Sequence, residues 1–377
     1  MRIAYVAAAQ IPSTRANSIQ VMKVCQALQQ NGQEVRLYVP GKTQFRWETL
    51  QHQYGLNTAV DIAWINHWRF LRYLDFTFKA LTQARNWHAD LVYTRMLQVA
   101  RSAALSGLPV ILELHDVPSG RLGPSRLRDF LCTPVHKRVV FITRSLRSLI
   151  EDQLAIEIPE EEVIIAPDGV DLERYSRLPS PSEARQTLGL SERITALYSG
   201  SFYQGRGLQT LFILAGMLRE MQFLWVGGTP EEVSTWKQKL KTAGIDNVLL
   251  TGYVNNSELP RYQAAADLLL MPYSRSVAGS SGGNIANVTS PMKLFEYMAC
   301  GRAIVTSDLP VLHEVLNEQN AVFCPPDDLQ TWKTTLQALA MDETKRQALG
   351  NQALIDVQQY SWRNRMRQIM DGWMTLQ

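Results

Sequence analysis

The sequence has few cysteines, and no two of them have the spacing of a metal or redox site. Cys25, Cys132, Cys300 and Cys324 stand far apart in a chain of 377 residues. The absence of a Cys-x-x-Cys pair disfavours zinc binding and thioredoxin-like chemistry. Cys25, Cys300 and Cys324 have apolar neighbours and are predicted to lie in the core. We therefore expect a reduced, cytoplasmic protein without disulfides.

Long apolar runs and a strong charge imbalance are also missing. No stretch of about 18 apolar residues occurs, so no membrane-spanning helix is expected. Residues 1–6 are predicted to form a strand, because their apolar run is too short for a secretory signal peptide. The formal net charge is only +3. The basic residues also lack an aromatic RNA-binding pattern, so a nucleic-acid partner is not expected.

Two segments nevertheless have an unusual composition. Seven basic residues accompany one acid, Asp129, in the first: Arg121, Arg126, Arg128, Lys137, Arg138, Arg144 and Arg147. They suit acceptor phosphates or anionic headgroups, and an ordinary solvated surface is an equal alternative. The second, residues 64–87, mixes aromatic and basic residues on a predicted helix. It suits a membrane interface, and burial against the first sheet is the alternative.

Short apolar strands alternate with amphipathic helices along the whole chain, which predicts an α/β fold with parallel sheets. The expected strands are 3–8, 34–39, 60–64, 91–94, 110–113, 138–143, 163–166, 194–199, 223–227, 248–251, 268–271, 303–306 and 321–323. A turn-rich stretch predicts a domain boundary. We expect domains at 1–175 and 176–360 and a C-terminal helix at 361–377, for which a return to the first domain is one arrangement.

The most informative motif is Ser-Pro-Met-Lys-Leu-Phe-Glu-Tyr-Met-Ala-Cys-Gly at residues 290–301. Ser290 is predicted to be a helix N-cap, Pro291 the first helical residue and Gly301 the end of the helix. An apolar strand follows at once. The start of such a helix has free N–H groups and a partial positive charge, which suits an anion.

Two side chains of this helix indicate which anion. Lys293 and Glu296 are three positions apart and share a helix face. A lysine for phosphate and a carboxylate for sugar hydroxyls, with the backbone at Thr289 and Ser290, suggest a nucleotide-sugar site. For the Lys-x-x-Glu pair alone, a solvated surface pair is the alternative.

Other strand ends carry residues suited to the same ligand. Gly200 and Ser201 end one strand, and Arg206 stands at the next helix start, where its guanidinium suits phosphate. The backbone of Gly252, Tyr253 and Val254 suits a nucleobase. A plain strand-to-helix turn is the alternative in both places. The loop 274–289, with Gly279, Gly282 and Gly283, is predicted either to close over a donor or to be a disordered surface loop.

Two strand ends in the first half also carry candidate residues. His115 follows a strand and suits a hydrogen bond to a sugar hydroxyl or a proton transfer. Arg95 follows another strand and suits an anionic acceptor group. A histidine or arginine without a ligand is the alternative for each.

Together these motifs resemble those of the family 4 retaining glycosyltransferases, in the subgroup written Ser-Pro-x-Lys-x-x-Glu-Tyr-Met-Ala. The resemblance covers most of the chain and rests on residues 163–171, 200–207, 251–254 and 290–301, with Glu314 downstream. It implies two facing, doubly wound Rossmann-like domains, the GT-B arrangement, with a cleft between them. It also implies transfer of a sugar from a nucleoside-diphosphate sugar to an acceptor hydroxyl with retention, and without a metal or other cofactor; no Asp-x-Asp pair is present.

The resemblance further suggests partners and a location. The acceptor would be a sugar, a lipid-linked molecule or a phosphorylated molecule, in polysaccharide, glycolipid or small-glycoside synthesis. The protein would be cytoplasmic, with peripheral attachment to the inner face of the membrane as an open alternative.

The resemblance assigns roles by position. Glu296 would bind the ribose hydroxyls, Arg206 takes the place of a diphosphate-binding lysine, and His115 would line the reaction centre. The residues expected to act in catalysis are His115, Arg206 and Lys293. The donor-binding residues are expected to be Gly200, Ser201, Arg206, Gly252, Tyr253, Val254, Thr289, Ser290, Lys293 and Glu296, and the acceptor-binding residues Arg95, His115 and Arg144.

Three positions depart from the family pattern. Ser201 stands where many relatives have a second diphosphate-binding arginine, and Val288 where many have an acidic residue that contacts the donor sugar. Residues 10–18 replace the usual glycine pair, with Ser18 as a predicted helix N-cap. Two other functions stay open: a nucleotide-sugar epimerase, which shares the two-domain arrangement, and a catalytically inactive nucleotide-binding relative, which the departures at Ser201 and Val288 suggest.

Overall fold

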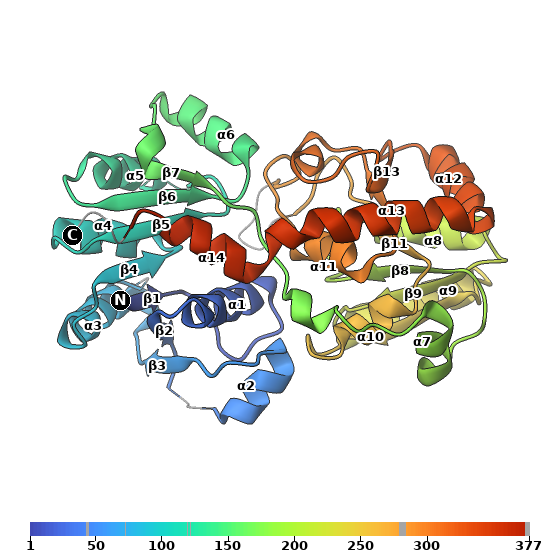
Figure 1. Cartoon of the computed structure of the whole chain (residues 1–377), viewed down its shortest axis with the longest axis horizontal. Coiled ribbons are helices and arrows are strands. Elements are labelled where there is room, and N and C mark those ends of the chain that lie inside the picture. The colour runs from blue at the N-terminus through green and yellow to red at the C-terminus, as the bar shows by residue number, and fades with distance from the viewer. Residues whose placement is uncertain (43–44, 72, 119, 121, 279–283, 374–377) are drawn as a thin grey trace. The chain divides into compact units, whose positions relative to one another are not determined.

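The computed structural model describes every residue except 43–44, 72, 119, 121, 279–283 and 374–377, and for Arg69 only the backbone (Figure 1). The chain divides into two compact units. The first consists of Met1–Asp168 together with the segment from Trp362 onward, and the second consists of Gly169–Ser361. The division follows Asp168 and Ser361, whereas the sequence-based boundaries follow 175 and 360. Gly279, Gly282 and Gly283, named above for the glycine-rich loop, lie outside the described residues.

The first unit contains a parallel sheet in the order β3-β2-β1-β4-β5-β6-β7. Its strands are β1 Arg2–Val6, β2 Glu34–Pro40, β3 Asp61–Ile65, β4 Leu91–Thr94, β5 Val110–Leu114, β6 Lys137–Phe141 and β7 Val163–Ile165. Its helices are α1 Ala16–Gln30, α2 Trp47–Tyr54, η1 Arg69–Leu71, α3 Leu74–Asn86, α4 Leu97–Leu105, α5 Gly123–Cys132, α6 Arg144–Leu154, η2 Glu160–Glu162 and α14 Trp362–Met370.

Helix α14 is part of the first unit although it is the last helix among the described residues. Figure 1 shows it beside α1, and the side chain of Asn31 donates a hydrogen bond to the carbonyl oxygen of Arg363 at 2.8 Å. Arg365 on this helix is buried. The first unit is therefore complete only when residues from both ends of the chain are present.

The second unit contains a parallel sheet in the order β10-β9-β8-β11-β12-β13. Its strands are β8 Thr195–Ser199, β9 Gln222–Val226, β10 Val248–Gly252, β11 Leu268–Met271, β12 Ala303–Ser307 and β13 Ala321–Cys324. Its helices are η3 Leu172–Arg174, α7 Pro181–Leu188, α8 Leu208–Met217, α9 Pro230–Thr242, α10 Leu259–Ala264, α11 Met292–Cys300, η4 Pro310–Glu314, α12 Leu329–Met341, α13 Glu343–Asp356 and η5 Val357–Tyr360.

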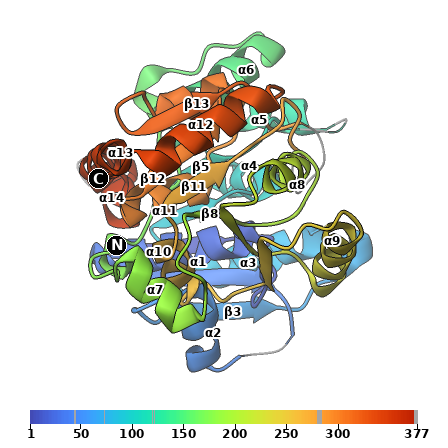
Figure 2. The same ribbon diagram turned by 90° about the vertical axis from the view of Figure 1, so that its right-hand side faces the viewer.

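Helices cover both faces of the second sheet, so its strands are apolar throughout. In β8, Ala196 and Tyr198 join one core cluster with α8 and α12, while Leu197 joins the other with α11. This alternation follows from the two-residue period of a strand. Figure 2 shows α8 and α9 on one side of this sheet and α10 and α11 on the other.

The sequence prediction of an α/β fold with parallel sheets is confirmed. All thirteen expected strands occur among the described residues, each with ends within two residues of the prediction.

Each sheet has a point at which the order of its strands reverses direction. This point lies between β1 and β4 in the first sheet and between β8 and β11 in the second. Ligands of such sheets bind at the carboxyl ends of the strands at this reversal. Cys25, Cys300 and Cys324 are buried, as predicted.

The start of α11 differs from the prediction. Pro291 has an extended conformation, with φ −79° and ψ 124°, and is the N-cap of a helix that begins at Met292. Ser290 is therefore not the N-cap, and Pro291 is not the first helical residue. Proline fixes only φ, near the value that both positions require, so the sequence alone does not distinguish them.

Two other helix predictions are wrong. Ser18 lies inside α1, where its hydroxyl donates to the carbonyl oxygen of Gln10 at 2.9 Å, and the N-cap is Arg15. The hydroxyl is used by a loop carbonyl instead of by the helix start. The segment 64–87 is not one helix: Trp64 belongs to β3, and the short η1 helix precedes α3.

Candidate functional site

Three glycines stand at consecutive strand ends of the second unit. Gly200 follows β8 and donates its N–H to Val226 at 2.9 Å, and Gly227 follows β9 and donates to Gly252 at 2.9 Å. A Cβ atom on Gly227 would lie 2.0 Å from the carbonyl oxygen of Gly200. At Gly227 the strand ends thus approach one another too closely for a side chain, so this part of the sheet edge consists of backbone.

Two cationic side chains meet at this edge. Lys293 comes from α11, and Arg206 comes from the loop between β8 and α8. The Lys293 Nζ atom is 3.8 Å from the ring centre of Tyr198 and 5.6 Å from that of Tyr273. The central guanidinium carbon of Arg206 is 5.2 Å from the ring centre of Tyr273. A Cβ atom on Gly200 would lie 2.7 Å from Lys293 Nζ, so Gly200, Arg206 and Lys293 come together.

Neither cation is fully satisfied within the protein. Lys293 Nζ and Arg206 Nε are buried and have no hydrogen-bond partner in the described part of the chain. Burial lowers the pKa of Lys293 well below its usual value, and the nearby charge of Arg206 lowers it further. Burying an unpaired charge is unfavourable. An anion between the two side chains would offset the repulsion between their positive charges. It would also accept the hydrogen bonds that Lys293 Nζ and Arg206 Nε lack.

Glu296 lies one helical turn beyond Lys293 on α11. Among the residues that the structure describes, its Oε2 atom accepts one hydrogen bond, from the side chain of Gln263 at 3.3 Å. The carbonyl oxygen of that amide in turn accepts from the hydroxyl of Tyr175 at 2.8 Å. A carboxylate has capacity for about four hydrogen bonds. Glu296 is therefore held in place while most of its acceptor capacity stays available.

The start of α11 adds a further positive region. Thr289 and Ser290 are buried directly before this helix, and Lys293 is its second residue. A helix N-terminus carries a partial positive charge equivalent to about half an elementary charge. It lies on the same short segment as the Lys293 ammonium group, so both favour a negatively charged ligand.

The other predicted donor-binding residues are less closely connected to Arg206 and Lys293. Ser201 accepts a hydrogen bond from the Tyr198 hydroxyl through its carbonyl oxygen at 2.7 Å. Tyr253 is exposed, and Val254 packs against a core cluster. Both follow β10, two strands away from β8 in the sheet. The role of Gly252, Tyr253 and Val254 at the base stays a prediction.

In the first unit, Arg95 and His115 belong to one hydrogen-bonded network. Arg95 follows β4 and donates to the side-chain oxygens of Asn17 at 2.8 Å and Gln20 at 3.0 Å. The amide nitrogen of Gln20 donates to Glu113 at 2.7 Å. The same carboxylate contacts His115 Nε2 at 2.5 Å. Two of the three predicted acceptor residues, Arg95 and His115, are thus connected through Gln20 and Glu113.

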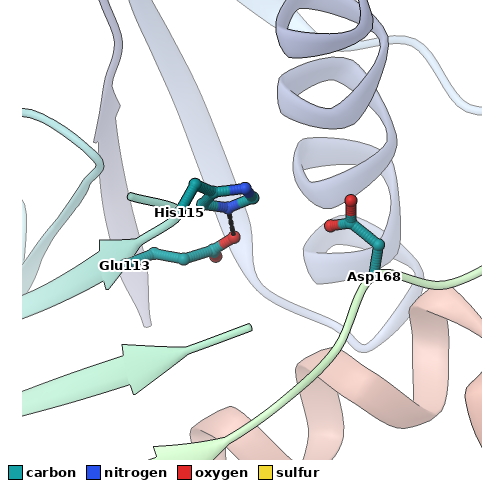
Figure 3. A group of neighbouring side chains, drawn as sticks. All are labelled: Glu113, His115 and Asp168. Atoms are coloured by element: carbon teal, nitrogen blue, oxygen red, sulfur yellow. Dashed lines mark hydrogen bonds and ion pairs between the residues drawn. The ribbon is translucent and has the colours of Figure 1, made fainter. Parts of the chain in front are cut away.

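Glu113, His115 and Asp168 form the acidic and imidazole cluster of Figure 3, in which one atom of each lies within 4.8 Å of the others. Such a group has the composition of a metal site, but Arg365 already places its guanidinium 3.0 Å from Glu113. Burial raises the pKa of Asp168 to about 7. Burial and the charge of Arg95 lower the pKa of His115 to about 4, so His115 is neutral near pH 7.

Two basic residues of the segment 121–147 form ion pairs, so they are not part of an open cationic surface. Arg147 contacts Glu151 at 3.1 Å and Glu160 at 2.7 Å, and Lys137 contacts Glu162 at 3.0 Å. Arg121 lies outside the described residues. Arg144 is exposed at the first position of α6, which begins three residues after the end of β6.

Several residues of the two sites were not anticipated from the sequence: Gln20, Glu113, Gln263, Tyr273 and Arg365. Glu113 had a signal, because it is an acid within an apolar strand and stands two positions before His115, on the same strand face. Gln263 and Arg365 had none, because their partners are distant in the sequence.

Two family models match separate parts of the chain. The model described as Glycosyltransferase Family 4 matches residues 18–174. The model described as Glycosyl transferases group 1 matches residues 193–342. Together the two matches cover most of the chain.

Curated relatives are identical to this chain at about a quarter of the aligned positions. Alpha-galactosylglucosyldiacylglycerol synthase of Streptococcus pneumoniae is 27% identical over 222 residues, which are 55% of this chain and 56% of the relative. A 2-deoxystreptamine glucosyltransferase of Streptomyces kanamyceticus is 26% identical over 220 residues, 52% and 57% of the two chains. The chain thus spans little more than half the length of these curated relatives.

Solved structures resemble the whole chain. Anabaena Alr3699/HepE in complex with UDP has a TM-score of 0.75 at 17% identity, with 100% of both chains covered. Sucrose-phosphate synthase from Thermosynechococcus elongatus has a TM-score of 0.74 at 17% identity, with 100% of this chain and 98% of that chain covered. At this identity the likeness establishes the fold, which consists of two Rossmann-like domains.

Proposed function

We propose that this chain, which belongs to the family 4 type of glycosyltransferases, transfers a sugar from a nucleoside-diphosphate sugar to an acceptor hydroxyl with retention. The supporting observation is the meeting of Arg206 and Lys293 beside Gly200, at the strand-order reversal of the second sheet. Two buried cations without hydrogen-bond partners at these atoms match the charge of a diphosphate. The UDP complex of Anabaena HepE, a structure with the same fold, is consistent with such a ligand.

The chemical need of the reaction accounts for the two cations. Departure of the leaving group places negative charge on the β-phosphate of the nucleotide. Arg206, Lys293 and the N-terminus of α11 would stabilise that charge through groups fixed before the reaction begins. A metal ion or other cofactor is not required in this scheme. Fixed donors of this kind do not have to reorganise during the reaction, which is the source of their effect on rate.

The acceptor would use residues of the first unit. Arg95 and Arg144 suit a phosphorylated or otherwise anionic acceptor, and His115 suits a hydroxyl group. The diacylglycerol and deoxystreptamine named for the two relatives make a lipid-linked molecule or a small glycoside reasonable acceptors to test. The product class we propose is therefore a glycolipid, a polysaccharide or a small glycoside.

The function is tested by a screen of nucleotide sugars followed by a transfer assay. A donor that binds the folded protein raises its apparent thermal stability by mass action. Stabilisation by one nucleotide sugar, with transfer to an added acceptor, is the expected result. Conversion of the nucleotide sugar without any acceptor would favour an epimerase. Tight binding without transfer to any acceptor would favour an inactive relative. The departures from the family pattern at Ser201 and Val288 would then explain the loss of activity.

Replacement of Glu296 by alanine is expected to weaken donor binding about 10- to 100-fold, since a hydrogen bond to a charged group contributes about 1.5–3 kcal/mol. Calorimetry with UDP and with its 2′,3′-dideoxy analogue isolates the ribose hydroxyls. The wild-type protein should prefer UDP, and Glu296→Ala should lose that preference. Glu314→Ala, which changes an acid on η4 of the same unit, is the control. An unchanged preference in Glu296→Ala would contradict the assignment.

An exposed apolar patch supports an anionic membrane surface as a further partner. Trp68, Phe70, Leu74 and Phe78 are 59%, 77%, 58% and 74% exposed. The rings of Trp68 and Phe70 stack with centres 5.8 Å apart, and Lys79 Nζ is 5.7 Å from the Trp68 ring centre. Apolar side chains beside a lysine suit the interface of an anionic bilayer. A cytoplasmic protein bound to the inner face of the membrane would fit this patch. No described helix is both long and apolar enough to cross a bilayer.

The double substitution Phe70→Ser and Phe78→Ser is expected to reduce binding to vesicles that contain phosphatidylglycerol by at least about 10-fold, because burying one phenylalanine contributes about 1.5–3 kcal/mol. Co-sedimentation measures the binding. Met341→Ser, which changes an 89% exposed residue of the second unit, is the control and should leave binding unchanged. Equal binding of the double variant and the wild-type protein would contradict the proposed surface.

A further inference from the structure

The buried carboxylate of Glu113 is the centre of a polar network in the first unit. It accepts hydrogen bonds from the side chains of Gln20 at 2.7 Å and of Tyr93, and it contacts Arg365 at 3.0 Å. Its fourth partner is His115 Nε2, at 2.5 Å. The Glu113 side chain is fully buried, whereas the His115 side chain is 17% exposed. Of these two residues, His115 can reach a ligand while Glu113 acts only through its neighbours.

Arg365 reaches this carboxylate from α14, at the far end of the chain. Its guanidinium also donates to the carbonyl oxygens of Pro167 at 2.7 Å and Ala166 at 3.0 Å. These two bonds fix the guanidinium independently of Glu113. Burial alone would raise the pKa of Glu113, but the charge of Arg365 and the bond to His115 hold it well below the usual value. Glu113 is therefore ionised.

An ionised carboxylate determines which nitrogen of His115 carries the proton. A carboxylate only accepts hydrogen bonds, so the imidazole nitrogen that contacts it must donate. Nε2 of His115 therefore carries hydrogen, and in the neutral ring Nδ1 has the free lone pair. Figure 3 shows Nε2 directed at Glu113 and the rest of the ring directed away from it, with Asp168 on the other side.

We propose that Glu113 and Arg365 are positioning residues that hold His115 in the Nε2–H form, so that Nδ1 accepts a hydrogen bond from a hydroxyl of a sugar substrate. The role of the hydroxyl rests on the proposed function; the tautomer does not. In this arrangement His115 acts as a neutral acceptor and not as a cationic acid. The charged groups around the ring are Glu113, Arg95, Arg365 and Asp168, and the first three are linked by the contacts given above.

The same network connects the histidine to Arg95. Gln20 donates its amide N–H to Glu113 and accepts from Arg95 through its amide oxygen at 3.0 Å. The direction of each bond is fixed, because Arg95 only donates and Glu113 only accepts. Gln20 thus has one allowed orientation. A change at Glu113 would therefore be transmitted to Arg95 as well as to His115.

The tautomer is measured directly in the full-length protein without any ligand. Histidine is labelled with ¹⁵N, long-range ¹H–¹⁵N correlation spectra are recorded near neutral pH, and the variant His115→Gln identifies the signal among the six histidines. The expected result is a neutral ring with hydrogen on Nε2. A ring with hydrogen on Nδ1, or a charged ring, overturns the proposal. Neither result depends on whether a sugar is transferred.

Variants then test whether Glu113 and Arg365 are the cause. Arg365→Lys keeps a cation and should keep the Nε2–H form. The pair Glu113→Leu with Arg365→Met removes both charges together, which avoids an unpaired buried charge if the single variant fails to fold. In this pair His115 should become a mixture of tautomers. A pure Nε2–H signal in the pair would show that other contacts set the tautomer and would overturn the proposal.

A kinetic measurement separates positioning from simple stability. With the donor identified by the screen described above, the pair Glu113→Leu with Arg365→Met should lower kcat by about 10-fold, the effect of one hydrogen bond, with donor KM little changed. The exposed ion pair Arg101–Asp129, at 2.9 Å in the same unit, supplies the matched control. Its removal through Arg101→Met with Asp129→Leu should change neither kcat nor the His115 signal. A folded Glu113 and Arg365 pair variant with wild-type kcat would overturn the functional part of the proposal.

Discussion

Alanine in place of Arg206 or of Lys293 is expected to lower the rate of sugar transfer on the order of 10²-fold each, the effect of removing one preorganised group from a site where negative charge develops. The two side chains share contact with the ring of Tyr273. Because they would act on the same diphosphate, the double variant should lose less than the product of the two single losses. Steady-state rates with the identified donor measure all three variants.

Stability measurements distinguish this effect from unfolding. The ammonium group of Lys293 is buried and lacks a hydrogen-bond partner among the described atoms, so Lys293→Met should leave the ligand-free protein at least as stable as the wild type. Lys239→Ala removes an exposed lysine that contacts Trp236 in the same unit, at 4.4 Å from the ring centre, and should leave the rate unchanged. Turnover near the wild-type rate in both Arg206→Ala and Lys293→Ala would contradict the donor site.

Methionine in place of Arg365 is expected to lower the free energy of unfolding of the first unit by about 3–5 kcal/mol, because it leaves the Glu113 carboxylate buried without its cation. The side chain of Arg365 is 3% exposed and that of Glu113 is 0% exposed, so solvent does not replace the lost contact. Adding Glu113→Leu removes the unpaired charge and should restore most of the loss. Thermal and denaturant unfolding measure the effect.

The controls for this prediction come from the same unit. Arg101→Met breaks an ion pair whose side chains are 38% and 46% exposed, and it should cost less than about 1 kcal/mol. If Arg365→Met proves as mild as Arg101→Met, the buried pair does not stabilise the first unit. If the double variant with Glu113→Leu is less stable than Arg365→Met alone, the loss does not come from an unpaired charge.

The sequence predicted the sheets well because local signals determine them. Each strand is a short apolar run between turn residues, and burial on both faces of a parallel sheet requires that composition. The motif at 290–301 predicted the helix and the two charged side chains on it. It did not predict the helix start, since Ser290 and Pro291 both suit an N-terminal position and local propensity does not rank them.

The contacts that make the sites work are long-range and were not predictable. Arg365 is 252 positions from Glu113, and Gln263 is 33 positions from Glu296. Nothing in the neighbouring residues of Arg365 distinguishes it from a surface arginine of an amphipathic helix. Likewise, the convergence of Arg206 and Lys293 on Tyr273 depends on the packing of two loops and α11. Only Glu113 had a local signal, an acid on the same strand face as His115.

Calorimetric titration of UDP and of uridine tests the central claim, that Arg206 and Lys293 bind a diphosphate. The measurement compares the wild-type protein with the double variant Arg206→Ala and Lys293→Ala; GDP with guanosine and ADP with adenosine serve if UDP does not bind. We predict that the wild type binds the diphosphate far more tightly than the nucleoside and that the double variant loses this difference while still binding the nucleoside. The same preference for the diphosphate in both proteins would contradict the account.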